Sequence, residues 1–348
     1  MGLPSLTRTK NYAQFIRLIV KHADFRDAYG RSTSKYELKE VREDAIKLVF
    51  VIESLGSTFI KLGQILVTRK TLFPSEITNE LARLQDDVKA IDGEVIASIV
   101  EKEIGASIKH IFESFEMKPI ATASLGQVHK AVLRSGESVV VKIQKPGVGE
   151  QIEEDLKLLD RSISFLNEVS DSFKRYYIQG ILDEFKSTIR RELDYTEESF
   201  NLETIQRNLK DFDHLVFPKP YMSYSSGLVL TMDYLEGQKI SNLTPTSLTD
   251  VQCEEIVETI FKAYLKQILV DGFIHSDPHM GNILLINNRD LAIIDLGMVT
   301  KIGPHIQKEL QHLLLAMGEG EAMEASEIAL RLALPMRGFN DDVSEFKN

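Results

Sequence analysis

Three residues with oxygen-bearing side chains, Asp277, Asn282 and Asp295, surround one short segment of the chain. Two strand-like runs, 282–286 and 291–295, are joined there by a turn, so the three side chains are expected to gather at the strand ends. Carboxylate and amide oxygens suit Mg²⁺, which keeps several waters and takes one or two protein ligands together with phosphate oxygens. A single Asp or Asn is more often a turn former, but three at these offsets favour a magnesium-phosphate site.

The same segment resembles two motifs of protein kinases. His275-Ser-Asp277 resembles the HRD catalytic loop, and Asp295-Leu-Gly resembles DFG. By this resemblance Asp277 would receive or orient the proton of the acceptor, while Asn282 and Asp295 would hold the metal.

A lysine and a loop that could bind phosphate precede this segment in the order found in kinases. Lys142 lies in VVVKIQKPG, which resembles the strand-borne lysine that pairs the α- and β-phosphates. A strand lysine is more often solvated, and it gains weight here from the order of the motifs. The segment ATASLGQV stands where kinases have a glycine-rich loop but holds only Gly126, so the nucleotide should lie differently. The alternative reading of this segment is an ordinary strand turn.

These motifs together resemble the signatures of the UbiB (AarF) family of atypical protein-kinase-like ATP-binding proteins. The matching stretches are KLGQ (Lys61–Gln64), ATAS (Ala121–Ser124), VVVKIQKPGV, ELD (Glu192–Asp194), HSDPHMGN and DLG, within about Val49 to Gly303. KLGQ and the Ala-rich loop matter most, because neither belongs to ordinary protein kinases. Thr122 departs from the commoner AAAS, and HSDPHMGN departs from the commoner HGDPHPGN.

The resemblance implies ATP and Mg²⁺ as ligands and gives each motif residue a role. It implies that Lys142 contacts phosphates and pairs with Glu198. It also implies that the N-terminal helices fold across the cleft, with Lys61 and Gln64 near the nucleotide and Lys61 near Glu192 and Asp194. The structural alternative for KLGQ is an amphipathic helix with its polar face in water. The expected nucleotide-binding residues are Ala121, Thr122, Ala123, Ser124, Lys142 and the hinge residues Met232, Asp233, Tyr234 and Leu235.

The patterning predicts an α+β, two-lobed protein-kinase-like fold with a helical N-terminal extension. The expected domains are 1–110 (helical, with KLGQ), 111–235 (small lobe with a helical insertion) and 236–348 (helical large lobe). The expected elements are helices within 36–105 broken at Pro74-Ser75, a hairpin of 127–133 with 138–143, helices at 149–172 and 178–211, a strand pair of 215–217 with 227–233, a buried helix opened by a capping box at Thr249–Gln252 and ended by Gly272, and a hairpin turning at Asn287-Asn288.

Composition excludes several other classes of protein. A formal net charge of -11 gives no general attraction to nucleic acid. Cys253 is the only cysteine, so an internal disulfide is excluded, and no Cys/His cluster has zinc-ligand spacing. The chain shows no transmembrane run and no signal-peptide pattern, and Leu6 disfavours acylation of Gly2. We expect a cytoplasmic protein, with peripheral contact to a membrane left open.

Three functions fit these observations. The first is a Mg²⁺-dependent ATPase or phosphotransferase that supports ubiquinone or related isoprenoid-quinone biosynthesis, with a lipid-like isoprenoid or quinone precursor, or water, as acceptor. The second is a small-molecule kinase of the aminoglycoside or choline kinase type, against which KLGQ and ELD argue. The third is a nucleotide-sensing pseudokinase scaffold, against which the complete set of Asp277, Asn282 and Asp295 argues.

Overall fold

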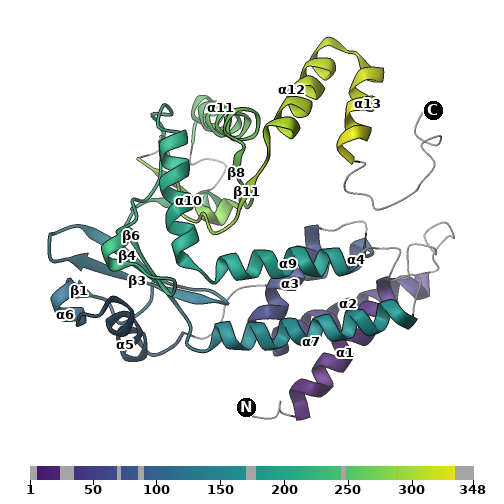
Figure 1. The fold of residues 1–348 in the computed structure, drawn as a ribbon, viewed down its shortest axis with the longest axis horizontal. Helices are drawn as coiled ribbons and strands as arrows, with labels where there is room; N and C mark the ends of the chain where they lie inside the picture. The colour runs from purple at the N-terminus through teal and green to yellow at the C-terminus, as the bar shows by residue number, and fades with distance from the viewer. Residues whose placement is uncertain are drawn as a thin grey trace. The chain divides into compact units, whose positions relative to one another are not determined.

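A computed structural model describes residues 6–23, 35–68, 72–84, 90–169, 178–243, 248–287 and 289–333 (Figure 1). The chain forms two compact units. Unit 1 is Met1–Ser199 with Pro220–Tyr234, and unit 2 is Phe200–Lys219 with Leu235–Asn348. Helices and sheets occur together, which confirms the predicted α+β class. The division into three domains remains a prediction, and the expectations for Gly2 and Asn288 lie outside the described residues.

Unit 1 begins with a helical subdomain whose helices share one apolar core. Apolar residues recur along these helices at helical spacing and face each other, as in the edge-to-face contact of Phe15 with Phe59, whose ring centroids are 5.2 Å apart. Pro74 precedes the fourth helix as its N-cap residue, which confirms the predicted break. The helices in this core are α1 (Leu6–Ala23), α2 (Lys35–Leu55), α3 (Ser57–Thr68), α4 (Ser75–Leu81), α7 (Val148–Val169) and α9 (Ile178–Glu192).

A second core of unit 1 lies at its antiparallel sheet. The predicted hairpin is confirmed, with Val128 opposite Lys142 in its register. Val139, Val141 and Ile143 point to one face, where they pack with α5 residues. The sheet order is β1-β3-β4-β6, with β2 paired to β3. The elements are α5 (Gly93–Ile104), α6 (Ile108–Ile111), β1 (Phe112–Phe115), β2 (Ala121–Thr122), β3 (Gly126–Leu133), β4 (Ser138–Gln144), η2 (Met222–Tyr224) and β6 (Val229–Asp233).

Two predictions for the segment 178–233 were wrong. The expected strand pair does not form, because β6 pairs with β4 in unit 1 while β5 (Leu215–Val216) pairs in parallel with a strand of unit 2. The expected helix over 178–211 is two helices, α9 and α10 (Tyr195–Asn208). Asp194 accepts hydrogen bonds from the backbone N–H and the hydroxyl of Thr196, and this local alternative to helical bonding starts the second helix.

Unit 2 holds two small sheets with helices. Thr249 and Gln252 form the predicted capping box, and Gly272 ends the following helical segment with φ of 60°. The sheets have the orders β5-β10-β9-β7 and β11-β8. The elements are β7 (Gln238–Lys239), η3 (Ile240–Asn242), α11 (Asp250–Lys266), the π-helical turn η4 (Gln267–Asp271), β8 (Phe273–His275), η5 (Met280–Asn282), β9 (Ile283–Ile286), β10 (Asp290–Ile293), β11 (Val299–Lys301), α12 (Pro304–Glu319) and α13 (Ala322–Ala333).

The prediction that α11 is buried was wrong. Only Ala263 of this helix is buried, while Val257 is 65% and Phe261 63% exposed. Apolar residues of α11 lie on most sides of the helix, but neighbouring elements cover only some of those sides. The spacing of apolar residues along a helix does not reveal which sides are covered. None of the described helices combines the length and the hydropathy that a bilayer-spanning segment requires.

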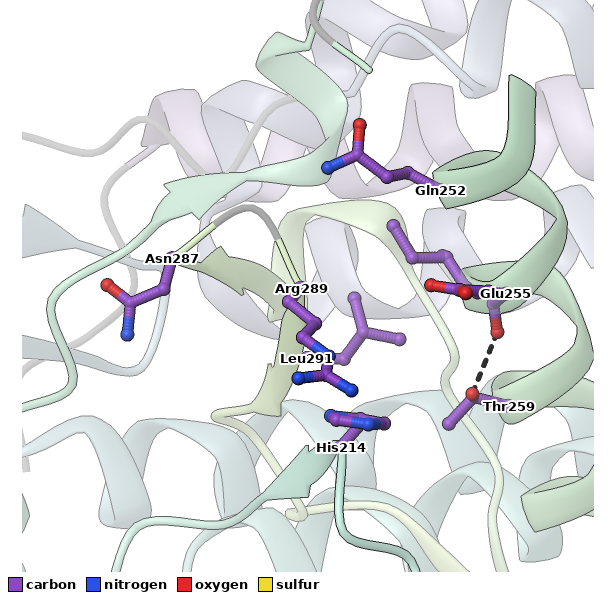
Figure 2. A pocket seen from close by; sticks show the side chains of 8 residues that line it. His214, Gln252, Glu255, Thr259, Asn287, Arg289 and Leu291 are labelled. Atoms are coloured by element: carbon purple, nitrogen blue, oxygen red, sulfur yellow. Dashed lines mark hydrogen bonds between the residues drawn. The ribbon is translucent and has the colours of Figure 1, made fainter. Parts of the chain in front are cut away.

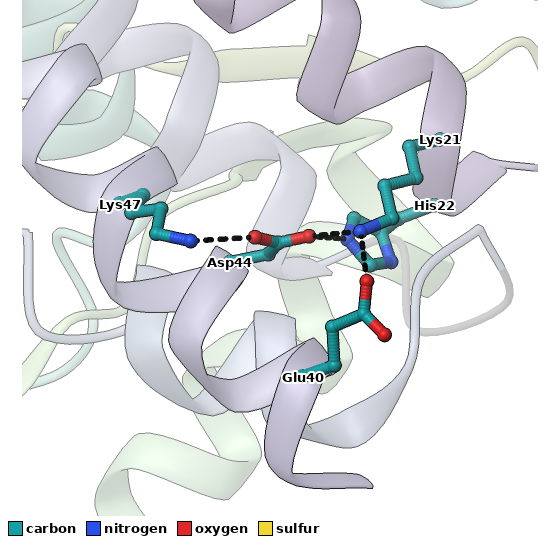
Figure 3. Close-up of polar contacts among 5 residues, drawn as sticks. All are labelled: Lys21, His22, Glu40, Asp44 and Lys47. Atoms are coloured by element: carbon teal, nitrogen blue, oxygen red, sulfur yellow. Dashed lines mark hydrogen bonds and ion pairs between the residues drawn. The ribbon is translucent and has the colours of Figure 1, made fainter. Parts of the chain in front are cut away.

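A polar cluster around the buried side chains of His22 and Asp44 joins α1 to α2 in unit 1 (Figure 3). The Asp44 carboxylate contacts the Nε2 atom of His22 at 3.1 Å and accepts hydrogen bonds from Lys21 at 2.6 Å and Lys47 at 3.2 Å. Burial alone would raise the pKa of Asp44, but these hydrogen bonds outweigh it and lower the pKa to about 2. Burial lowers the pKa of His22 more than Asp44 raises it. The cluster therefore combines an ionised carboxylate with a neutral imidazole at neutral pH.

Candidate functional site

Lys142 and Glu198 form a buried ion pair in unit 1. The Lys142 Nζ atom lies 2.7 Å from Oε1 and 2.8 Å from Oε2 of Glu198, and the two side chains are only 14% and 4% exposed. The alternation of β4 directs Lys142 away from the face that buries Val141 and Ile143. This contact is the one that the family resemblance implied. Its distances fit a charge-assisted, bidentate interaction that holds the ammonium in one place.

The phosphate-loop candidate is the tight turn between β2 and β3. The N–H group of Ala123 donates to the carbonyl of Gly126 at 2.8 Å. A Cβ atom on Gly126 would lie 2.6 Å from the Tyr195 hydroxyl and 2.7 Å from the Ile143 carbonyl, so close approach requires glycine here. Ser124 is fully buried, and its Oγ has no hydrogen-bond partner among the residues that the structure describes.

The cleft-capping candidates are partly brought together in unit 1. Lys61 on α3 lies with its Nζ 3.1 Å from the Glu192 carboxylate. Gln64, half-buried, follows on the same helix. Asp194 accepts from Thr196 at the start of α10, so it has a capping role that sequence reasoning did not assign. The roles of all four residues toward a nucleotide stay predictions.

The predicted hinge residues include the last two residues of β6, Met232 and Asp233, which pair with Val140 and Val139 of β4, and the two residues that follow. Met232 is buried, Asp233 accepts a hydrogen bond from the Tyr221 hydroxyl at 2.8 Å, and the N–H of Tyr234 donates to the Ser138 carbonyl at 3.0 Å. Burial and this aspartate raise the pKa of Tyr221 to about 12. Leu235 is the first residue of the following segment of unit 2.

In unit 2 the register of the β9–β10 hairpin places Asn282 opposite Ile294, the residue before Asp295. Ile283 lies opposite Ile293, and the N–H of Ile294 donates to the Asn282 carbonyl at 3.0 Å. The Oδ1 atom of Asp295 accepts from the N–H of Gly297 at 3.1 Å. The two oxygen-bearing side chains therefore start from adjacent positions at one end of the hairpin.

A buried histidine lies near the two motif aspartates, Asp277 and Asp295. His275 is 2% exposed, and its Nδ1 atom lies 3.0 Å from the Tyr264 hydroxyl. Burial lowers the pKa of His275, while the charges of Asp295 and Asp277 oppose that shift. Burial and the charge of Asp277 also raise the pKa of Tyr264. Both carboxylates thus act on one imidazole, whereas the Asp277 side chain itself is exposed.

Sequence reasoning missed two residues that support the motif residues of unit 2. His275 was visible as the first residue of HSD but was not assigned a role. Asn201 on α10 is buried, and its amide donates to the Leu296 carbonyl at 2.9 Å, which holds the residue that follows Asp295. No motif marks Asn201, because its partner lies far away in the chain.

The donor set of unit 2 fits Mg²⁺ only with additional oxygen ligands. Within the described ranges, no three His, Cys, Asp or Glu side chains come together as a group able to hold a metal ion. One amide and one carboxylate, from Asn282 and Asp295, match the small protein share that Mg²⁺ takes when phosphate and water complete its shell.

A cavity of about 250 Å³ lies elsewhere in unit 2, between α11 and the β9–β10 hairpin (Figure 2). None of the predicted catalytic, nucleotide-binding or metal-binding residues lines it. The lining residues are His214, Gln252, Glu255, Ile256, Thr259, Asn287, Arg289 and Leu291. The cavity is therefore separate from the candidate site.

Comparison with known proteins decides the family. The model of the ABC1 atypical kinase-like domain matches residues 83–329. The chain belongs to the ABC1 atypical kinase-like family. It is 37% identical over 298 residues to Protein ACTIVITY OF BC1 COMPLEX KINASE 7, chloroplastic, of Arabidopsis thaliana, covering 86% of this chain and 43% of that protein. It is 29% identical over 324 residues to AarF domain-containing kinase 1 of Drosophila melanogaster, covering 91% of this chain and 62% of that protein.

A solved structure extends the comparison to three dimensions. The complex structure of Rv3197-erythromycin from Mycobacterium tuberculosis is similar with a TM-score of 0.56 and 27% identity, covering 90% of this chain and 79% of that chain. The predicted membership in the UbiB (AarF) group and the predicted kinase-like fold with a helical N-terminal region are thereby confirmed. This ABC1 chain spans 34% to 46% of the length of the first four curated relatives that it matches.

Proposed function

We propose that this ABC1 chain binds Mg·ATP and transfers the γ-phosphoryl group to a small acceptor or to water. The Lys142–Glu198 ion pair is the observation that carries the proposal. The two Glu198 oxygens hold the Lys142 ammonium in one largely buried position. From that position the ammonium could also contact a further anionic partner. Membership in a kinase-like family supports triphosphate as that partner.

The residues of unit 2 supply the complementary half of the proposal. Asn282 and Asp295 would hold Mg²⁺. The metal would neutralise the negative charge of the phosphate oxygens. Asp277 would take the proton that the attacking hydroxyl or water loses as its oxygen bonds to phosphorus and the bridging oxygen leaves with ADP. The exposure of Asp277 suits contact with an acceptor.

The Ser124 hydroxyl supports nucleotide binding next to the loop. A buried hydroxyl without a partner costs about 1–3 kcal/mol, and the described structure leaves the Ser124 Oγ in that state. A phosphate oxygen that accepts a hydrogen bond from this hydroxyl would remove the cost. Lys142, Ser124 and the exposed Ala121 and Ala123 would then bind the phosphates from unit 1.

Single-turnover hydrolysis of ATP with and without Mg²⁺ tests the proposal. We expect Asp295→Asn to reduce the Mg²⁺-dependent rate by 10²-fold or more, because a neutral amide replaces the carboxylate next to the metal. Asp213→Asn, which removes an exposed carboxylate from the same unit, is the control and should keep the parent rate. Nucleotide binding without any metal-dependent turnover in the parent would instead support a nucleotide-sensing scaffold.

The nature of the acceptor is the finer part of the proposal. A lipid-like isoprenoid or quinone precursor, in support of ubiquinone or related quinone biosynthesis, follows from the UbiB resemblance. The complex of the similar mycobacterial protein with erythromycin supports a bulky small molecule rather than a protein as ligand. The Lys61–Glu192 contact, which joins the KLGQ helix to α9, favours this reading over a small-molecule kinase of the choline kinase type. A cytoplasmic location with contact to a membrane remains a prediction.

A further inference from the structure

Two side chains hold consecutive carbonyl groups of the phosphate-loop candidate in unit 1. The Ser57 hydroxyl, at the start of α3, donates to the Ser124 carbonyl at 2.7 Å. The Lys145 ammonium, just after β4, donates to the Ala123 carbonyl at 2.6 Å. Because a trans peptide is planar, each bond also fixes the direction of the N–H group that follows.

Further contacts fix the part of the loop that contains Ser124 and Leu125. The Leu125 side chain is buried in the core of the N-terminal helical subdomain, and the N–H of Lys145 donates to the Leu125 carbonyl at 2.9 Å. The Ala123–Gly126 hydrogen bond closes the turn. Ala121 and Ala123 are exposed, whereas Ser124 and Leu125 are buried, so one half of the loop is anchored and the other half faces outward.

The anchoring residue Ser57 itself stands on a fixed base. Thr58, fully buried, donates to the Asp155 carboxylate of α7 at 2.7 Å, and Arg8 of α1 donates to the same carboxylate at 2.6 Å. Gly56, with φ of 96°, separates α2 from α3 and allows the chain to turn just before Ser57. Helices α1, α3 and α7 therefore meet at the point from which Ser57 reaches the loop.

We infer that Ser57 and Lys145 are positioning residues through which the N-terminal helical subdomain preorganises the phosphate loop. Kinase loops with several glycines are free to adapt to phosphate, but this loop has one glycine and takes its shape from outside. A loop that is already ordered loses less conformational entropy when a ligand binds. The inference rests on the proposed function for its effect on nucleotide affinity, whereas the anchoring itself is independent of any nucleotide.

Hydrogen-deuterium exchange of the loop, measured on the nucleotide-free full chain, tests the anchoring. Ser57→Ala should speed exchange of the amides in residues 121–126 by on the order of 5-fold, as expected for the loss of one hydrogen bond. Ser57→Thr, which keeps the hydroxyl, should exchange at the parent rate. Ser98→Ala is the matched control, because the Ser98 hydroxyl also donates to a backbone carbonyl, that of Glu94 at 2.9 Å, but on α5.

Binding of an ATP analogue, measured in parallel, tests the consequence. We expect Ser57→Ala and Lys145→Met each to weaken binding by on the order of 5-fold, and Ser57→Ala to lower the melting temperature by no more than about 2–4 °C. Unchanged loop exchange in Ser57→Ala would overturn the anchoring, and faster exchange with unchanged affinity would overturn its role in binding. Faster loop exchange in Ser57→Ala, together with a parent protein that binds no ATP analogue, would support the anchoring while refuting the proposed function.

Discussion

Removal of the Lys142 ammonium should destabilise the sheet of unit 1, because it leaves the Glu198 carboxylate buried without its bidentate cation. Breaking a buried ion pair by deleting one partner costs about 3–5 kcal/mol. With side chains 14% and 4% exposed, we expect Lys142→Met to cost about 3 kcal/mol. The double variant Lys142→Met/Glu198→Gln should cost about 1–2 kcal/mol less than the single variant, since no buried charge remains.

Native-state hydrogen exchange of the β4 amides measures this effect locally, which suits a chain with two compact units and no tryptophan. Lys262→Met is the matched control. Lys262 also pairs with a glutamate, Glu258, at 2.6 Å, but both side chains are more than 60% exposed, so little stability should be lost. The reasoning is refuted if Lys142→Met costs no more than this control, or if the Lys142 and Glu198 substitutions prove additive.

Two further outcomes follow from the described contacts. The packing of α1 on α2 should weaken on acidification. Because the pKa of His22 is lowered, the unfolded state takes up a proton first, and stability should be lost as the pH falls through about 6.5. A second loss of stability should follow between about pH 3.8 and pH 2, where Asp44 protonates. In a titration of α1 amide exchange, His22→Gln should remove only the step at the higher pH. Gly126→Ala should cost about 1–3 kcal/mol in thermal unfolding, because its Cβ would overlap the Tyr195 hydroxyl and the Ile143 carbonyl. Adding Tyr195→Phe should recover part of that loss, and an unchanged melting temperature in Gly126→Ala would contradict the close approach.

Local chemistry allowed much of the fold to be predicted from the sequence. The hairpin that bears Lys142 follows from alternation around a turn, and the capping box at Thr249 and the stop at Gly272 follow from backbone groups that need nearby partners. The motif residues Asp277, Asn282 and Asp295 could be singled out for the same reason, since their spacing along one hairpin is itself local.

Pairings between distant segments were decided only by the tertiary structure. The partner of β5, the break between α9 and α10, and the exposed face of α11 depend on which surfaces meet, and single-segment periodicity carries no such information. Asn201 and Ser57 carry no motif, because each acts on a backbone carbonyl far away in the chain. Residue types and spacing therefore determined which groups could carry chemistry, whereas long-range packing determined what holds them in position.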